Sequence, residues 1–314
     1  MDSSKHRFSG HETFPCRYAW LPKAVDALRE DELIFTKMDE AIVLMGLGKN
    51  MVKALKFWVT AMKVAEPSDI LYGLRVSSFG ERLFGNGRKK GFDPFLEDIR
   101  TLWLLHWQLC AHEDNPIFAW EFLLSRFHET EIRKSVVVPI IEREAQQLDR
   151  PLSNVTLAQH FEVFLHSYVP TRGRKSEIKE DNLDCPLIEL ELIEYIGDRT
   201  ASDGKSEPAY AFRMEPKAEI SPALFMFCLD DYWSRTRPKE STLSFKEIAN
   251  ETGSPGQVFK LPEDDIRERL FAISTESEGR FEFSDSSLVE KVTRHSGVEV
   301  DFLDLVYNGE LANA

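Results

Sequence analysis

Two helical segments separated by a glycine turn constrain the fold of this chain more than any other feature. Residues 37–45 and 49–65 both have helical periodicity, and Gly46-Leu47-Gly48 between them suits a left-handed cap and a tight turn. In the second segment the apolar residues recur as on one side of a helix: Met51, Val52, Leu55, Trp58, Val59 and Met62. The pattern predicts a helix-turn-helix with a buried seam.

The flanking segments extend this prediction to a winged helix. Residues 20–28 are typical of a first short helix, and residues 74–79 are strand-like. Residues 85–91, Gly-Asn-Gly-Arg-Lys-Lys-Gly, form a glycine-rich basic loop. We therefore expect residues 39–91 to fold as a winged helix, with the basic loop as its wing.

The rest of the chain is predicted to be mainly helical with short strands, an α+β class. We expect three domains: an N-terminal winged helix (1–91), a mainly helical middle domain (92–240) and a C-terminal winged-helix-like unit (241–314). In the last, Ser244 and Glu247 have the spacing of a capping box. Its second helix begins with Glu263, Asp264 and Asp265, which would repel phosphate. This unit is therefore expected to bind protein, and a homodimer is left open.

The charge distribution points to DNA despite a net charge of −14. Between residues 49 and 90 there are nine basic and three acidic residues, an excess of six positive charges. The first turns of a recognition helix enter the major groove, which favours Lys49, Asn50, Lys53 and Lys56 as DNA contacts. Arg88, Lys89 and Lys90 would add phosphate contacts from the loop. The alternative is a solvated lysine face on a core helix. Gly48-Lys49-Asn50 lacks the remaining residues of a P-loop.

An N-terminal string, Phe8-Ser-Gly-His-Glu-Thr-Phe14, carries the candidate catalytic pair. His11 and Glu12 would supply a base and a carboxylate, and Arg17 would hold a phosphate bidentately. The alternative is a structural segment packed by its two phenylalanines. His106, between Leu105 and Trp107, is interpreted as a core histidine.

Other classes are disfavoured by composition. No apolar run is long enough to span a bilayer, and the polar N-terminus is unlike a secretory signal. The four cysteines lie far apart without a CxxC pair, which argues against a zinc ribbon or a disulfide framework. Cys185 has no neighbouring histidine to activate it. We expect a cytoplasmic protein that does not contact membranes.

Five strings carry a resemblance to a known family: FSGHETFPCRYAWLPKAV, GLGKNMVKALKFW, FDPFLEDIRTLWLLHW, LDCPL and SPGQVFKL. They resemble the domain-of-unknown-function family of bacterial DNA phosphorothioation operons. Members of that family are similar to the nickase component of the Ssp single-strand system. The strings lie between residues 8 and 261, so the resemblance covers most of the chain.

The resemblance implies a protein that binds double-stranded DNA and nicks one strand before sulfur is incorporated. It also implies association with a cysteine desulfurase, an ATPase and a sulfur-transfer protein. A nickase would need a divalent metal, Mg or Mn, although no known nuclease motif can be placed in the sequence. The alternative is a non-catalytic adaptor that recruits the modification proteins. A transcriptional regulator ranks third, because the middle region has no obvious sensor motif.

Overall fold

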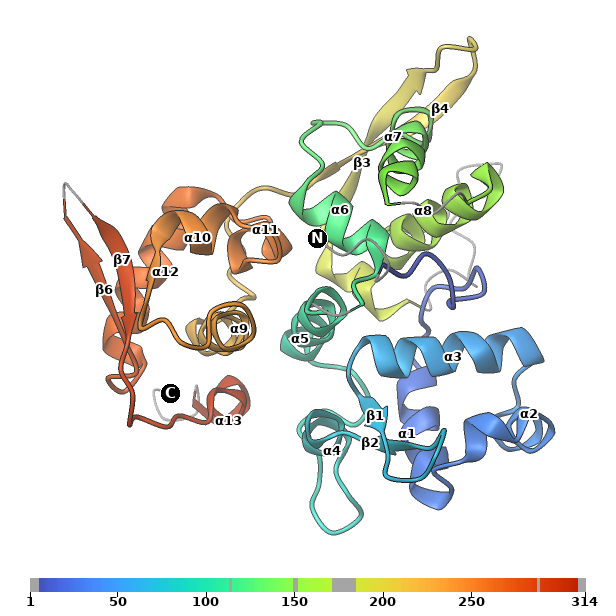
Figure 1. Ribbon diagram of the computed structural model, residues 1–314, viewed down its shortest axis with the longest axis horizontal. Coiled ribbons are helices and arrows are strands. Elements are labelled where there is room, and N and C mark those ends of the chain that lie inside the picture. The colour runs from blue at the N-terminus through green and yellow to red at the C-terminus, as the bar shows by residue number, and fades with distance from the viewer. Residues whose placement is uncertain (1–5, 113–114, 149–151, 171–184, 287–288, 310–314) are drawn as a thin grey trace. The chain divides into compact units, whose positions relative to one another are not determined.

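A computed structural model describes residues 6–112, 115–148, 152–170, 185–286 and 289–309 (Figure 1). The chain divides into two compact units, one of residues 1–120 with 129–211 and one of residues 121–128 with 212–314. Helices dominate both, and the described residues form two sheets of two strands and one of three. The predicted α+β class is confirmed. The division into three domains, with boundaries after residues 91 and 240, stays a prediction.

The first unit begins with the predicted helix-turn-helix. Its early elements are α1 (Trp20–Glu30), α2 (Met38–Met45), α3 (Lys49–Ala61), β1 (Ala65–Pro67), β2 (Leu74–Val76) and α4 (Ser78–Phe84). Gly46 ends α2 in the left-handed region at φ 64°, as a glycine at this position readily does. On α3, Leu55, Trp58 and Met62 are fully buried, whereas Met51 is half-buried. The buried seam is thereby confirmed.

A short hairpin follows α3. β1 and β2 pair antiparallel, with Glu66 opposite Arg75. The amide of Leu74 also donates to the carbonyl of Glu32, in the link between α1 and α2, at 2.9 Å. The three helices and β2 follow one another in the predicted order, with a 3-10 helix (Ile34–Thr36) between α1 and α2 and the unpredicted β1 after α3. Membership of the winged-helix class stays a prediction.

The strand predicted at residues 74–79 is too long, and the basic loop predicted to follow this strand follows a helix instead. Ser77 begins a helix there, because its hydroxyl accepts a hydrogen bond from the amide of Gly80 at 3.0 Å. The strand therefore ends at Val76, and the basic loop of residues 85–91 follows α4 instead of a strand. The β1–β2 turn, residues 68–73, takes the place expected for a wing. It presents three exposed apolar side chains, those of Ile70, Leu71 and Tyr72.

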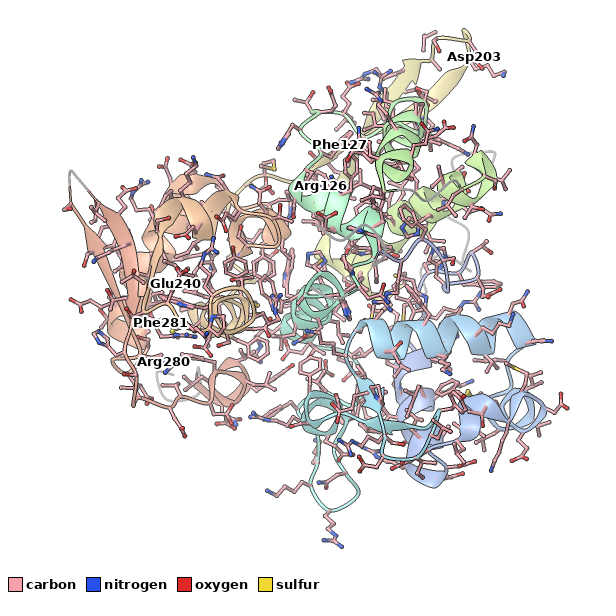
Figure 2. The ribbon with its side chains drawn as sticks, in the orientation of Figure 1. Arg126, Phe127, Asp203, Glu240, Arg280 and Phe281 are labelled. Atoms are coloured by element: carbon pink, nitrogen blue, oxygen red, sulfur yellow. The ribbon has the colours of Figure 1, made fainter. Side chains whose placement is uncertain are left out.

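The rest of the first unit is a helical layer with a projecting hairpin. It comprises α5 (Ile99–Cys110), the start of α6 (Phe118–Ser125), α7 (Lys134–Gln147), α8 (Asn154–Tyr168), a 3-10 helix (Pro186–Leu190), β3 (Ile193–Thr200) and β4 (Ser206–Phe212). Trp120 packs edge-on against Trp58 of α3, with ring centroids 5.8 Å apart. This contact joins the layer to α3. Asp203 lies in the β3–β4 turn (Figure 2). The sequence between residues 170 and 184 is polar and is predicted to be a loop, and residues 171–184 lie outside the described residues.

The second unit contains α9 (Pro222–Thr236), β5 (Thr242–Ser244), α10 (Phe245–Asn250), α11 (Pro255–Phe259), α12 (Glu263–Glu276), β6 (Phe281–Asp285), β7 (Glu290–Arg294) and α13 (Phe302–Asn308). The predicted capping box of Ser244 and Glu247 is confirmed. Ser254 caps α11, and Pro255 occupies the first turn of this helix. In the sheet, β7 lies between β5 and β6.

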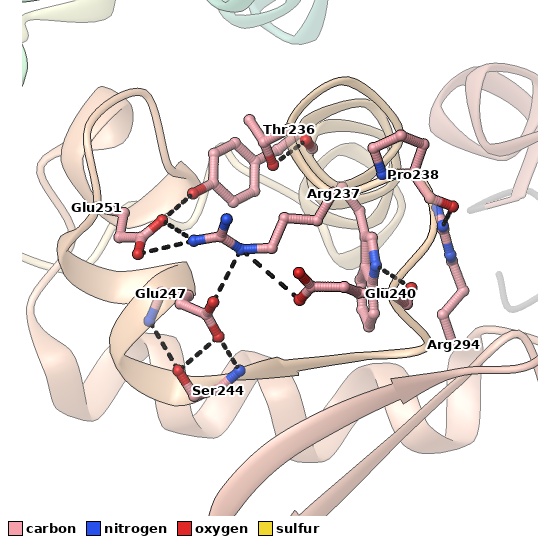
Figure 3. Close-up of polar contacts among 10 residues, drawn as sticks. Thr236, Arg237, Pro238, Glu240, Ser244, Glu247, Glu251 and Arg294 are labelled. Atoms are coloured by element: carbon pink, nitrogen blue, oxygen red, sulfur yellow. Dashed lines mark hydrogen bonds and ion pairs between the residues drawn. The ribbon is translucent and has the colours of Figure 1, made fainter.

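Arg237 ties the end of α9 to α10. Its guanidinium contacts Glu247 at 2.8 Å and Glu251 at 2.8 Å, and Glu240 lies 3.9 Å away (Figure 3). Burial lowers the pKa of Arg237, but the carboxylates of Glu251 and Glu247 outweigh this effect, so the pKa is raised. The ion-pair cluster makes α9 part of the C-terminal unit.

Candidate nucleic-acid interface

The solvent-facing side of α3 carries a row of cations. Lys49, Asn50 and Lys53 are exposed and Lys56 is half-buried. The lysines follow one another at spacings of four and three residues, so they share the helix face opposite Leu55 and Trp58. Within the described residues, no carboxylate pairs with Lys49 or Lys56. This lysine row therefore presents positive charge to solvent.

Lys53 has a partner from the N-terminal segment. Its ammonium lies 3.7 Å from Oε1 of Glu12, and both side chains are partly exposed. An ion pair in contact with water contributes less than about 1 kcal/mol, so an incoming phosphate can displace Glu12 from Lys53. Of the predicted catalytic and DNA-binding residues, the structure brings these two into contact.

The basic loop does not join the lysine row. Arg88, Lys89 and Lys90 are exposed, and the side chain of Asn86 accepts hydrogen bonds from the amides of Arg88 and Lys89. In Figure 1 this loop extends below α4, whereas the first turn of α3 lies beside α2, away from the loop. The cations predicted to form one surface thus form two.

Residues 7–14, here called the strap, cross α3 and hold it to the helical layer. Toward α3, the guanidinium of Arg7 lies over the ring of Phe57 at 5.4 Å, and the indole of Trp58 donates to the carbonyl of Phe14 at 2.9 Å. A side chain at Gly10 would lie 2.8 Å from the ring of Phe57, so the close crossing requires glycine. Toward the layer, the ring of Phe8 stacks on that of Phe118 at 4.5 Å. The two phenylalanines and the glycine of this string therefore have packing roles.

His11 of the strap is buried against His160 of α8. Nε2 of His11 lies 2.9 Å from Nδ1 of His160, and the rings are stacked. The amide of Ala119 donates to Nε2 of His160 at 3.0 Å, and the amide of Thr13 donates to Nδ1 of His11 at 3.3 Å. Burial lowers the pKa of His11 to about 4 and that of His160 well below its ordinary value. Both imidazoles are neutral at pH 7.

The predicted catalytic pair, His11 and Glu12, and the predicted phosphate ligand Arg17 have different surroundings. His11 is only 4% exposed and faces the layer, while Glu12 faces α3. Glu12 and Thr13 both have a left-handed backbone conformation, with φ of 49° and 70°. This turn of the chain directs the side chain of Glu12 away from that of His11. The guanidinium of Arg17 lies over the ring of Trp20 at 5.7 Å. The arrangement makes Glu12 the accessible carboxylate beside the lysine row, with His11 as an anchor.

A metal site is not preformed in the part of the chain that the structure describes. No group of three or more histidine, cysteine, aspartate or glutamate side chains there is placed to hold a metal ion. Glu12 stands beside a lysine, a neighbour that disfavours a cation. The Mg or Mn ion expected of a nickase stays a prediction, because Mg²⁺ is usually held by one or two carboxylates together with water and substrate phosphates.

Buried polar groups elsewhere were only partly foreseen. His106 is fully buried, and its Nδ1 lies 2.8 Å from the hydroxyl of Tyr168, which confirms that it belongs to the core. Lys217 is also fully buried, which its polar sequence context did not indicate. Its ammonium donates to the carbonyls of Arg213, Glu215 and Lys260 at 2.8, 3.0 and 3.1 Å. Burial lowers the pKa of Lys217 to about 8. Three backbone carbonyls therefore hold the ammonium of Lys217. Sequence periodicity cannot predict such a contact, because it depends on the path of the backbone.

Comparisons with known proteins agree with this architecture. The fold is similar to two SspB crystal structures, one of them described as magnesium ion-bound. That one has a TM-score of 0.82 at 25% identity, and the other 0.81 at 24% identity. Each match covers 98% of this chain and 90% of the other. No curated protein matches. Among the helices that the structure describes, none combines the length and hydropathy needed to cross a bilayer. The model of a protein family of unknown function, DUF4007, matches residues 8–307, and the chain belongs to this family.

Proposed function

We propose that this chain binds duplex DNA through the lysine row of α3, as a cytoplasmic component of a bacterial phosphorothioation system. The row itself is the observation that carries the proposal. Lys49, Asn50 and Lys53 occupy the first turns of a helix that follows a helix and a glycine turn. In helix-turn-helix proteins this part of the second helix contacts the major groove. Lysines there reach phosphates, and asparagine can pair with adenine.

The place in a phosphorothioation system is supported by the similarity to SspB over nearly the whole chain. By family resemblance, its partners would be a cysteine desulfurase, an ATPase and a sulfur-transfer protein. The acidic start of α12, with Glu263, Asp264 and Asp265 in its first turn, supports protein binding by the C-terminal unit. Light scattering, which measures the molar mass in solution, tests whether this unit also forms a homodimer.

Nicking is the finer part of the proposal, and it rests on the family resemblance. Hydrolysis of one strand requires a group that takes a proton from the attacking water and a cation that holds the phosphate. Glu12 and Lys53 are the accessible pair with these properties at the lysine row. The similar magnesium-bound structure motivates testing Mg and Mn. The proposal routes no step through such an ion, because no group of three or more ligand side chains is preformed among the described residues.

DNA binding is tested with Lys49→Ala and Lys56→Ala together, measured by fluorescence anisotropy on a duplex across a salt series. For each phosphate that the double variant no longer neutralises, the slope of log K against log salt should fall by about 1. Lys205→Ala is a matched control, because Lys205 is exposed on the β3–β4 hairpin and pairs with Asp203 at 2.8 Å. Identical salt slopes for the parent and the double variant would remove α3 from the interface.

Nicking is tested separately by relaxation of supercoiled plasmid with Mg or Mn, with and without chelator. Conversion to open circles supports the nickase. A second candidate function, a non-catalytic adaptor, is favoured by the burial of His11 and its bond to His160. An adaptor would bind with the same salt slope and leave the plasmid supercoiled under every metal condition.

A further inference from the structure

Helix α2 has an apolar ridge that packs against nothing in the described part of its own unit. Val43 is 82% exposed and Leu44 is 50% exposed, whereas Ala41 and Met45 of the same helix are buried. Two large apolar side chains in succession on a well-formed helix are unfavourable in water. Single exposed apolar residues are common, but an exposed pair bordering hollows indicates an interaction surface.

A hollow lies on each side of this ridge. One, of about 340 Å³, is lined by residues of α1 and by the last turn of α2, including Lys23, Ala27 and Met45. The other, of about 670 Å³, is lined by the end of α1, by Ile34 and by the first turns of α2. Val43 and Leu44 line both. A partner can therefore place one apolar side chain on each side of the ridge.

The rim of these hollows is acidic. Among the described residues, five carboxylates line them against the single cation Lys23: Asp26, Glu30, Asp31, Asp39 and Glu40. The ammonium of Lys23 is held by the carbonyl of Met45 at 3.1 Å, and Asp31 is paired with Lys37 at 2.7 Å. Asp26 also pairs with Arg29 at 3.4 Å, and Glu40 lies 3.9 Å from Lys37, but the two carboxylate side chains are 77% and 69% exposed. Together with the other rim carboxylates they surround an apolar centre, the usual layout of a protein interface. Their charge repels DNA and anionic lipid.

We propose that the α1–α2 groove is a docking surface for a basic amphipathic segment of a different protein. Apolar residues of that segment enter the two hollows, and its lysines or arginines face Asp26, Asp39 and Glu40. The acidic rim selects a basic occupant over the same groove of a second copy, because two such rims facing each other would repel. The docking surface does not depend on whether the chain binds or cuts DNA.

The test uses the full chain and a synthetic helical peptide of about 15 residues, with leucines along one face and lysines along the other. A matched peptide has serine in place of every leucine and the same charge. We expect the leucine peptide to bind and to shift the amide resonances of residues 23–46. The serine peptide should bind at least about tenfold more weakly, because charge alone supplies no anchor.

Val43→Ser with Leu44→Ser should weaken binding of the leucine peptide about tenfold or more and leave the melting temperature unchanged, because both side chains are exposed. Val155→Ser, at a similarly exposed position on α8, is the control. If the double variant melts early, Val43→Ser alone is used. Equal binding by variant and parent, or shifts centred elsewhere, would overturn the proposal. So would a parent dimer in light scattering that the double variant abolishes, because the occupant would then be a second copy.

Discussion

Nε2 of His11 lies 2.9 Å from Nδ1 of His160, so residues 149 positions apart in sequence form one buried hydrogen-bonded pair. The pair fastens the strap to α8, and through Phe57 and Trp58 the strap holds α3. The candidate DNA-binding helix is thereby fixed to the helical layer. Protonation of either ring would place a charge in this interior, so the pair makes the position of the strap sensitive to acid.

Acidification should destabilise the protein through this pair. Folding lowers the pKa of His11 from 6.5 to about 4, so the unfolded chain binds the proton more readily. Stability from this residue is complete above pH 6.5 and is lost as the pH falls toward 4. By pH 5 the loss is roughly 2 kcal/mol. Urea unfolding at pH 7.5, 6 and 5 should show a smaller loss for His11→Gln than for the parent. His128→Gln, at an exposed position, serves as control, and parallel pH profiles for all three would contradict the assignment.

The two groups of cations should contribute unequally to DNA binding. Replacing Arg88, Lys89 and Lys90 by alanine removes three exposed charges from the loop after α4. Because this loop lies away from the start of α3, we expect a small, salt-dependent loss of affinity without a change in sequence preference (Figure 1). Replacing Asn50 by alanine should instead reduce discrimination between duplexes by about 1–3 kcal/mol. Binding assays on a panel of duplexes compare the two. A larger loss of discrimination in the loop variant would place the reading surface at residues 85–91.

Lys217→Met should destabilise the second unit. The substitution fills a similar volume but leaves the carbonyls of Arg213, Glu215 and Lys260 without their donor. Buried acceptors without partners cost about 1–3 kcal/mol each, so a loss of several kcal/mol is expected. Lys205→Met, on the surface, should change stability by less than about 0.5 kcal/mol. Thermal unfolding measures both, and equal midpoints would mean that water replaces the ammonium.

Alkaline pH provides an independent check on the same lysine. Folding lowers the pKa of Lys217 from 10.5 to about 8, chiefly by burial. The unfolded chain therefore holds the proton between pH 8 and 10.5 while the folded chain has released it, so this group's contribution to stability rises with pH in that window. Lys217→Met should lack this rise. A variant whose stability follows the parent between pH 8 and 10 would show that the lysine stays charged.

Periodicity predicted the parts of the fold that depend on local pattern. The seam of α3, the glycine cap of α2 and the capping box of Ser244 and Glu247 were found because each depends on residues a few positions apart. β1, Ala-Glu-Pro, was missed, since three residues including a proline carry no strand pattern. The strand at residues 74–79 was predicted too long, because Ser77 caps α4 and so ends β2 at Val76.

The candidate site depended on contacts that no sequence pattern contains. The lysine row follows from helical spacing and was predicted. The side chains of His11 and Glu12 point in different directions because the backbone is left-handed at two residues and because His11 pairs with His160. The sequence of residues 8–14 indicates neither of these features. The basic loop was assigned to the same surface because it is close in sequence, although α4 directs it elsewhere. The sequence of α2 gives no sign that Val43 and Leu44 are exposed.

The carboxylate of Glu12 has two candidate roles, and one substitution of this residue tests both. As a partner of Lys53 it neutralises one cation of the lysine row at 3.7 Å. As a general base it would take the proton of the attacking water while Lys53 holds the phosphate. Its partial exposure and its place on the strap permit either role. Glu12→Gln keeps the shape of the side chain and removes its charge, and Glu66→Gln, which removes a comparably exposed partner of Arg75, is a matched control.

We expect Glu12→Gln to bind DNA about two- to fivefold more tightly, because an ion pair worth less than about 1 kcal/mol no longer competes with phosphate for Lys53. Plasmid relaxation by the same variant then separates the two roles. A fall in nicking rate of about two decades, with tighter binding and an unchanged melting temperature, identifies the carboxylate as the base. An unchanged rate leaves Glu12 as a partner of Lys53 alone, and weaker DNA binding would remove it from the interface altogether.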